Sequence, residues 1–349
     1  MPRPRLADAV GGGLLLLVAA TVVVSSVVGA GNPWPALATL TVAGASYAAG
    51  RQLMPRLLAV AGIAAATTLV PLIALPFALS SAPLGPPLAY ANANAALYVQ
   101  AAGIAGVAAV LAGSGVWQEA TVACSVVLVL TAGAMQSVGG FVTGSAVVAA
   151  ISASLFRWRL PARSVLAGGI AVVLIGAHVA VLVLGATHRP SVHASSSEAA
   201  VTASLSERRL DLWSDAVRLA TDHPLIGVGP RRFPAASPTA QLDPDTREAH
   251  SATLQMAAEV GWPGAVALLA LLVWAATRPL LVGSSRMSTG VGLITATTAA
   301  ALAVHASVDY LFQFPVLIAT AGFILGLGTA AAEAPTRVQP PSHIARPAR

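Results

Sequence analysis

The sequence predicts an all-α, polytopic membrane protein, and three observations lead to this fold class. Hydrophobic residues make up 56% of the 349 residues and charged residues only 9%. The mean hydropathy is +0.78, whereas a soluble domain carries about 25% charged residues. The apolar residues also gather in long runs. Lipid forces such runs to form helices, because the backbone must satisfy its own hydrogen bonds there.

Ten apolar runs approach the roughly 20 residues that a membrane span needs. They lie at 10–30, 35–50, 57–80, 88–112, 119–137, 139–156, 164–186, 263–281, 288–310 and 312–332. The second run is short, and only Gly139-Gly140 separates the fifth from the sixth. We therefore predict about ten spans, seven of them before the one long polar segment and three after it.

The basic residues set the orientation. All nineteen are arginines, and arginine in short loops marks the cytoplasmic side. In a ten-span arrangement the arginines of 3–5, 51–56, 157–163, 278–286 and 337–349 all fall on one side. The short loops on the other side contain none. We therefore predict that both termini are cytoplasmic and that the long segment is extracytoplasmic.

The same pattern predicts four parts of the chain. Residues 1–186 form an N-terminal transmembrane bundle, 187–262 an extracytoplasmic loop with short helices, and 263–332 a C-terminal transmembrane part. Residues 333–349, rich in Pro and Arg, form a disordered cytoplasmic tail. The net charge of +6 comes with no continuous basic face, which argues against nucleic acid as a partner. The single cysteine, Cys124, excludes an internal disulfide.

The long segment contains an amphipathic helix. Ser204 and Glu207 have the spacing of a capping box, so we expect the helix to begin there, with Leu210, Trp213 and Val217 on one face. Pro224 ends it, and Gly227 and Gly229 then form a turn. A helix that simply lies on the membrane would account for the apolar stripe, but not for the Arg208-Arg209 pair beside Trp213.

A second, shorter helix is expected over residues 250–260. Pro263, between Gly261 and Gly264, should break any helix that continues into the next span. About ten residues are too few to cross the membrane, so an interfacial or re-entrant position is favoured. Ser251, Gln255 and Glu259 share one face.

His250 stands at the start of that helix. The positive end of the helix dipole disfavours protonation of the imidazole there. A neutral imidazole at the membrane surface is a candidate general base. The alternative is a histidine that only caps the helix.

These motifs together resemble the bacterial O-antigen ligase and polymerase superfamily of membrane glycosyltransferases. The pattern H-[NSQ]-x9-G-x-x-G is matched by His250, Ser251, Gly261 and Gly264. The preceding R-x3-W…HPLIGVGP…F is matched by Arg209, Trp213, residues 223–230 and Phe233. The segments GPPLAYANANAALYVQ at 85–100 and VHASVDYLFQFP at 304–315 are also similar to family segments. The resemblance covers most of 85–330 and is most specific over 209–264.

The resemblance implies a GT-C-like helical bundle in the bacterial cytoplasmic membrane. It implies a polyprenyl-diphosphate-linked glycan as donor and a glycan, lipid or protein as acceptor, with transfer on the extracytoplasmic side. His250 would be the base and Arg209 the clamp for the diphosphate, since a guanidinium matches phosphate geometry. By chemistry Arg208 is an equally good donor, and only the spacing to Trp213 separates the two arginines.

Further residues are candidates for binding substrate. They are Arg208, Arg232, Tyr90, Asn92, Asn94, Gln255, Glu259, His305 and Asp309. His305 and Asp309 are one turn apart near a span end, where ionisable residues are functional by default. A structural His–Asp pair that ties helices together is an equally good interpretation. The asparagines could bind sugar or only join helices.

One position departs from the family pattern. Members usually carry an arginine in a middle span, and here the matching segment TAGAMQSVGG places Val138 at that position. The D-x-D sequence at 243–245 is interpreted as a turn, because its proline is rigid and nucleotide sugars are absent outside the cell. The histidines lack metal-ligand spacing. We therefore predict no metal and no other cofactor.

Two other functions remain open from the sequence. A transporter or flippase of lipid-linked glycan should show inverted repeats and polar residues at mid-membrane, and the first six runs contain almost no ionisable residues. A non-catalytic relative that supports envelope assembly is favoured by Val138. Sugar identity, acceptor type, and the choice between ligase and polymerase have no readable signal in the sequence.

Overall fold

The computed structural model of the chain describes residues 6–54, 85, 87–112, 116–156, 160–189, 198–242, 246–282 and 286–334. Every regular element within these ranges is a helix. The helices are α1 (Leu6–Gly29), α2 (Trp34–Leu53), α4 (Ala91–Ala112), α5 (Val116–Ala134), α6 (Val138–Leu155), α7 (Arg163–Thr187), α8 (Glu198–Asp222), α9 (Phe233–Ala236), α10 (Pro238–Gln241), α11 (Ala252–Val260), α12 (Trp262–Thr277), α13 (Arg286–Ser307), η1 (Leu311–Gln313) and α14 (Pro315–Glu333).

Helices occupy every predicted apolar run except 57–80, which lies outside the described residues. Six of them are long and apolar enough to cross a membrane, namely α1, α4, α6, α7, α13 and α14. Two shorter apolar helices, Gln118–Ala134 and Trp262–Thr277, accompany them. The prediction of a polytopic helical bundle is confirmed at this level, whereas the count of ten spans is not established.

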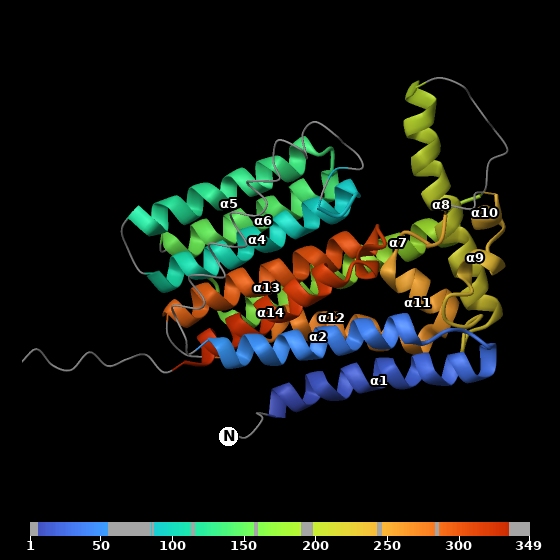
Figure 1. Cartoon of the computed structure of the whole chain (residues 1–349), viewed down its shortest axis with the longest axis horizontal. Coiled ribbons are helices and arrows are strands. Elements are labelled where there is room, and N and C mark those ends of the chain that lie inside the picture. The colour runs from blue at the N-terminus through green and yellow to red at the C-terminus, as the bar shows by residue number, and fades with distance from the viewer. Residues whose placement is uncertain are drawn as a thin grey trace, which may run out of the picture.

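The long apolar helices run alongside one another, and α8 stands at an angle to them at one end, together with the short helices α9–α11 (Figure 1). Helices α4, α5 and α6 form a layer that packs on α13 and α14, and α2 lies along α14. Helix α1 packs on α12 and α2. Helices α8–α11 lie at the end of the bundle opposite to the start of α1 and the end of α14 (Figure 1).

The break between α5 and α6 lies at Gln136 and Ser137, and not at the Gly139-Gly140 pair as predicted. Gln136 adopts a left-handed backbone conformation, with φ of 60°, and Ser137 caps α6 by accepting a hydrogen bond from the Gly140 amide. The Gly139-Gly140 pair forms the first turn of α6 and does not interrupt the helix. A side chain at Gly140 would overlap Ala95 of α4, so this glycine serves close helix packing.

A buried ionic cluster joins α1, α2, α12 and α14 at the end where α1 begins. Arg278 donates to Asp8 at 3.0 Å and to Glu333 at 2.7 Å. Arg51 donates to the same two carboxylates, at 3.0 and 2.9 Å. Buried charges need such pairing because desolvating them is costly. Two guanidinium groups and two carboxylates balance each other, which fixes α1 and α2 on the bundle.

At the opposite end, the turn between α1 and α2 packs on residues 226–230. Ser25 donates to the carbonyls of Ile226 and Glu259 at 2.6 and 2.8 Å. The Asn32 amide donates to the Pro230 carbonyl at 3.0 Å. Gly227 adopts a φ of +63°, and a side chain on it would overlap the backbone at Glu259. The glycines of this segment therefore let two backbones pack directly against each other.

Helix α8 begins at Glu198, so the predicted start at Ser204 is wrong. Ser204 lies inside the helix, because the Ala-rich residues before it continue the helical turn. The end is as predicted, at Asp222 before Pro224. The buried face carries Leu212, Trp213, Ala216 and Leu219, which pack with Phe233 and Leu254. Arg218 pairs with Asp215 and Asp222, as its spacing predicts.

Candidate functional site

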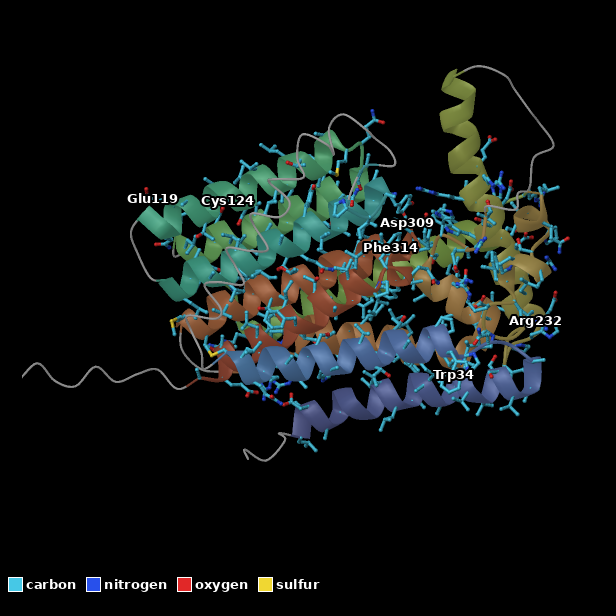
Figure 2. The ribbon with its side chains drawn as sticks, in the orientation of Figure 1. Trp34, Glu119, Cys124, Arg232, Asp309 and Phe314 are labelled. Carbon is cyan, nitrogen blue, oxygen red and sulfur yellow. The ribbon has the colours of Figure 1, made fainter. Side chains whose placement is uncertain are left out.

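Asp309 is the centre of a polar cluster that three segments assemble. It lies in the turn after α13 and is only 1% exposed. The Tyr90 hydroxyl donates to its two carboxylate oxygens at 2.9 and 2.7 Å, and Asn92 donates to the second oxygen. The Nδ1 atom of His250 lies 3.3 Å from Oδ1 of Asp309. The start of α4, the end of α13 and the start of α11 therefore meet at one carboxylate, near the middle of the molecule in Figure 2.

Asp309 remains ionised despite its burial. Burial by itself opposes ionisation, but the contacts with His250 and Tyr90 and the charge of Arg209 hold the pKa of Asp309 below its ordinary value. A buried carboxylate beside an imidazole can orient the ring and stabilise its protonated form. No described residue donates or accepts a hydrogen bond at Nε2 of His250, so this nitrogen is the one that can exchange a proton with a bound molecule.

The local structure explains why His250 stands where it does. Its φ is 51°, a left-handed conformation that is uncommon for a residue other than glycine. Its carbonyl accepts a hydrogen bond from the Trp213 indole at 3.2 Å, and its ring packs edge-on against Tyr310, with 4.6 Å between centroids. The next residue, Ser251, caps α11. The backbone of His250 is therefore fixed from both sides.

Helix α8 explains the R-x3-W spacing. Residues four apart share one face of a helix, so Arg209 lies on the same face as Trp213, which contacts His250. The charge of Arg209 acts on both Asp309 and Tyr310. Within the described part of the chain Arg209 makes no hydrogen bond or ion pair. Arg208 differs, since its guanidinium donates to the Thr246 hydroxyl at 3.0 Å.

His305 belongs to the cluster, but its predicted pairing is not formed as expected. Helix α13 ends at Ser307, so Asp309 is not on the same helix face and contacts His250 instead. His305 is buried, within electrostatic range of Asp309 and Arg209. A side chain at Gly139 would overlap its ring. The start of α6 thus lies beside the cluster, while Val138 itself is 76% exposed.

Two candidate residues lie elsewhere. Asn94 is buried and closes the turn before α4: its amide donates to the Gly85 carbonyl and its oxygen accepts from the Leu88 amide. These hydrogen bonds give Asn94 a structural role in the turn. Arg232 lies beside Val28 and His223 at the C-terminal end of α1, far from Asp309 and toward Trp34 in Figure 2. The structure does not bring either residue to the cluster.

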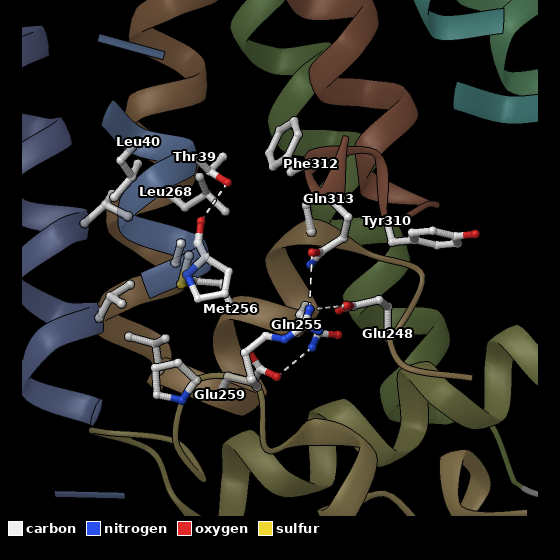
Figure 3. A pocket seen from close by; sticks show the side chains of 18 of the residues that line it. Thr39, Leu40, Glu248, Gln255, Met256, Glu259, Leu268, Tyr310, Phe312 and Gln313 are labelled. Carbon is white, nitrogen blue, oxygen red and sulfur yellow. Dashed lines mark hydrogen bonds and ion pairs between the residues drawn. The ribbon is translucent and has the colours of Figure 1, made fainter. Parts of the chain in front are cut away.

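A cavity of about 200 Å³ opens on the other side of His250. Helices α1, α2, α11 and α12 surround it, and His250 and Tyr310 line its edge. Gln255 and Glu259 lie in it, joined by a hydrogen bond of 2.8 Å. Figure 3 shows Leu40, Leu268 and Met256 toward one end and Glu248, Gln255 and Gln313 toward the other. The cavity is therefore apolar at one end and polar at the end near His250.

Three polar residues of this cavity were not predicted. Arg231 donates to Glu248 at 2.9 Å and to Gln313 at 3.3 Å. Arg231 faces the cavity in place of Arg232 because its own φ is 66° and that of Gly229 is 103°, which no residue pattern reveals. Glu248 could have been found, since a carboxyl two residues before a candidate base is a detectable signal. No feature of the sequence pattern singles out Gln313.

The carboxyl groups of the cavity are shifted toward their neutral forms. Burial first, and Glu259 second, raise the pKa of Glu248 to about 8, even though Arg231 opposes the shift. Burial also raises the pKa of Glu259, against the hydrogen bonds and the Arg231 charge that lower it. Both carboxyl groups lie within electrostatic range of the one guanidinium of Arg231. In the described residues no group of three His, Cys, Asp or Glu side chains is arranged to hold a metal ion.

The fold and the cluster define a multi-pass helical membrane protein with a polar site at its helix ends. Residues 119–269 match the family model described as O-antigen ligase. This match agrees with the resemblance of the motifs to the O-antigen ligase and polymerase superfamily. The match includes Arg209 and His250, whereas Tyr90 and Asp309 lie outside it. Among curated proteins, none matches the chain.

Proposed function

We propose that the protein is a membrane glycosyltransferase that moves a glycan from a polyprenyl-diphosphate-linked donor to an acceptor hydroxyl, without a metal. The observation that carries the proposal is the contact between His250 and the ionised Asp309. This arrangement supports general-base catalysis, because the carboxylate stabilises the imidazolium that forms when the base takes a proton.

The proposed reaction uses three residues. Nε2 of His250 takes the proton of the acceptor hydroxyl as its oxygen attacks the anomeric carbon of the donor sugar. The bond from that carbon to the diphosphate oxygen breaks, and the diphosphate leaves on its lipid. Arg209 stabilises the charge of the leaving group, which is consistent with its lack of a partner among the described residues. Asp309 holds the ring and balances its positive charge.

The proposal includes the arrangement in the membrane. Residues 1–186 and 263–332 would form the transmembrane parts, 187–262 the extracytoplasmic segment, and 333–349 a cytoplasmic tail. The distribution of arginine in the short loops supports this orientation. The cluster would then face the extracytoplasmic side of the bacterial cytoplasmic membrane, where lipid-linked glycans are used. The position of the cluster at helix ends, and not at mid-helix, favours an enzyme over a transporter.

The test is transfer from a lipid-linked donor in membranes, with and without the His250 imidazole. We expect His250→Ala to lower the rate by at least about 100-fold, the lower range for a positioned base. The amount of protein in the membrane should stay normal, because the contacts of this side chain are few. A variant that accumulates normally and keeps most of its activity would reduce His250 to a helix-capping residue and would favour a non-catalytic relative.

A further inference from the structure

The cavity beside His250 is built for a molecule with two unlike ends. Its apolar end is formed by Val18 and Val22 of α1, Leu40 of α2 and Leu268 of α12. These three helices run alongside one another in the helical bundle (Figure 1). Its polar end carries Glu248, Gln255 and Gln313 (Figure 3). His250 also lines the cavity. An apolar chain and a polar head group would each find matching surroundings.

The cation at the polar end already has partners inside the protein. Arg231 is the cation of this end, and it pairs with Glu248 and is under the influence of Glu259. The Arg231 guanidinium already donates to Glu248 and Gln313, so it is not free to bind an anionic ligand. The groups that remain are a carboxyl, two carboxamides and a phenol, which exchange hydrogen bonds with hydroxyl groups.

The cation that suits a diphosphate lies outside the cavity. Arg209 does not line the cavity, and it has no partner in the described part of the chain. Its charge acts on Asp309 and Tyr310. His250 therefore lines the cavity and also contacts Asp309, which is within range of the Arg209 charge.

We propose that this cavity is the acceptor subsite, and that the acceptor is an amphiphile with an uncharged, hydroxyl-bearing head group and an apolar chain. The proposal rests on the proposed glycosyltransferase function. The head group would lie at Glu248 and Gln313, with a hydroxyl toward His250, and the chain would lie between α1, α2 and α12. The donor diphosphate would bind on the Arg209 side.

The test measures protection of a thiol inside the cavity. Thr39 lines the cavity, whereas Thr41 lies on the same helix, is exposed and does not line it. Each threonine is replaced by cysteine in a Cys124→Ser protein, which is reconstituted in phosphatidylcholine vesicles and treated with a maleimide. Octyl glucoside, below its micelle concentration, represents the uncharged amphiphile, and octyl phosphate represents a lipid phosphate.

Octyl glucoside should slow the alkylation of Thr39→Cys about tenfold at saturation, because a ligand in a cleft covers the residues that line it. It should leave Thr41→Cys unchanged, and octyl phosphate should protect neither. Equal or better protection by octyl phosphate would assign the cavity to the donor and overturn the proposal. Protection of both positions, or of neither, would overturn it as well.

A charge variant sharpens the result. Glu259→Gln keeps the shape but removes an acidic group near Arg231, so octyl phosphate should now protect Thr39→Cys. If this variant does not fold, the comparison of octyl glucoside with octyl phosphate on the unaltered cavity still tests the proposal. In a His250→Ala background the protection should persist. Protection without any transfer activity would therefore contradict the proposed function alone, and transfer without protection would contradict only the acceptor subsite.

Discussion

Nδ1 of His250 lies 3.3 Å from Oδ1 of Asp309, although the two residues belong to different elements. Asp309 is the more buried of the two, and Tyr90 and Asn92 fix its carboxylate. The carboxylate can therefore orient the imidazole so that Nε2 faces away from it. In this arrangement Asp309 is a positioning residue, and the candidate chemistry belongs to His250.

This relationship predicts the effect of Asp309→Asn. The substitution keeps the size of the side chain but removes the charge that stabilises the imidazolium, so the kcat for transfer should fall by at least about 100-fold. The KM for the donor should change little, because Asp309 does not contact the diphosphate in the proposed arrangement. Steady-state transfer assays with purified protein give both values.

Tyr90→Phe is a milder change at the same carboxylate than Asp309→Asn. It removes one hydrogen bond to the carboxylate and should lower kcat by at least about tenfold, since a hydrogen bond to a charged group contributes about 1.5–3 kcal/mol. A larger loss with Tyr90→Phe than with Asp309→Asn would mean that the tyrosine acts on substrate directly. Full activity of Asp309→Asn would leave the carboxylate with a structural role only.

The adjacent arginines of α8 offer a matched pair. Arg209→Gln should lower transfer by about 100-fold, the scale for loss of one preorganised charge-stabilising donor. Arg208→Gln should change it by less than about fivefold, the range of a surface polar contact, because the Arg208 guanidinium is held by Thr246. Transfer assays of both variants at equal protein levels decide between them, and equal losses would contradict the assignment of the clamp to Arg209.

The sequence predicted those parts of the fold that depend on local pattern. The apolar runs gave the positions of the long helices, and Gly261 with Pro263 gave the break between α11 and α12. The spacing of Arg209 and Trp213 indicated one helix face. The start of α8 was missed because a capping box is only a local signal, and the Ala-rich residues before Ser204 outweigh it.

The partnerships within the site required the three-dimensional structure. His305 and Asp309 are close in sequence and suggested a pair, but the end of α13 at Ser307 turns Asp309 toward His250. The choice of Arg231 over Arg232 for the cavity follows from left-handed backbone angles at Gly229 and Arg231. Long-range contacts and single backbone angles of this kind leave no trace in residue spacing.

Glu248 predicts a pH dependence of stability. Its pKa rises from the ordinary 4.5 to about 8 in the folded protein, so the folded state favours the neutral carboxyl. The stability that this group contributes is fully present below pH 4.5 and is lost as the pH rises through about 8. Glu248→Gln, which stays neutral, should remove this part of the decline in Tm.

Thermal unfolding of both proteins in the same detergent, in steps across that pH range, measures the difference. Because the other titrating groups are common to the two proteins, the gap between their Tm values isolates Glu248. The gap should widen in favour of Glu248→Gln as the pH rises. A constant gap would mean that Glu248 is already ionised at low pH and pairs with Arg231 as an ordinary ion pair.

The last prediction concerns the orientation of the site in the membrane. Leu6 and Leu242 are each 84% exposed, Leu6 at the start of α1 and Leu242 after α10, at opposite ends of the bundle (Figure 1). In a Cys124→Ser protein, Leu242→Cys should react with an impermeant maleimide in intact cells, because the one-sided arginine distribution predicts that α8–α11 are extracytoplasmic. Leu6→Cys should react only after the membrane is permeabilised. Equal exposure makes the two positions matched controls for reactivity. The reverse pattern would put His250 and Asp309 in the cytoplasm and would remove the proposed site from a lipid-linked donor on the outer face.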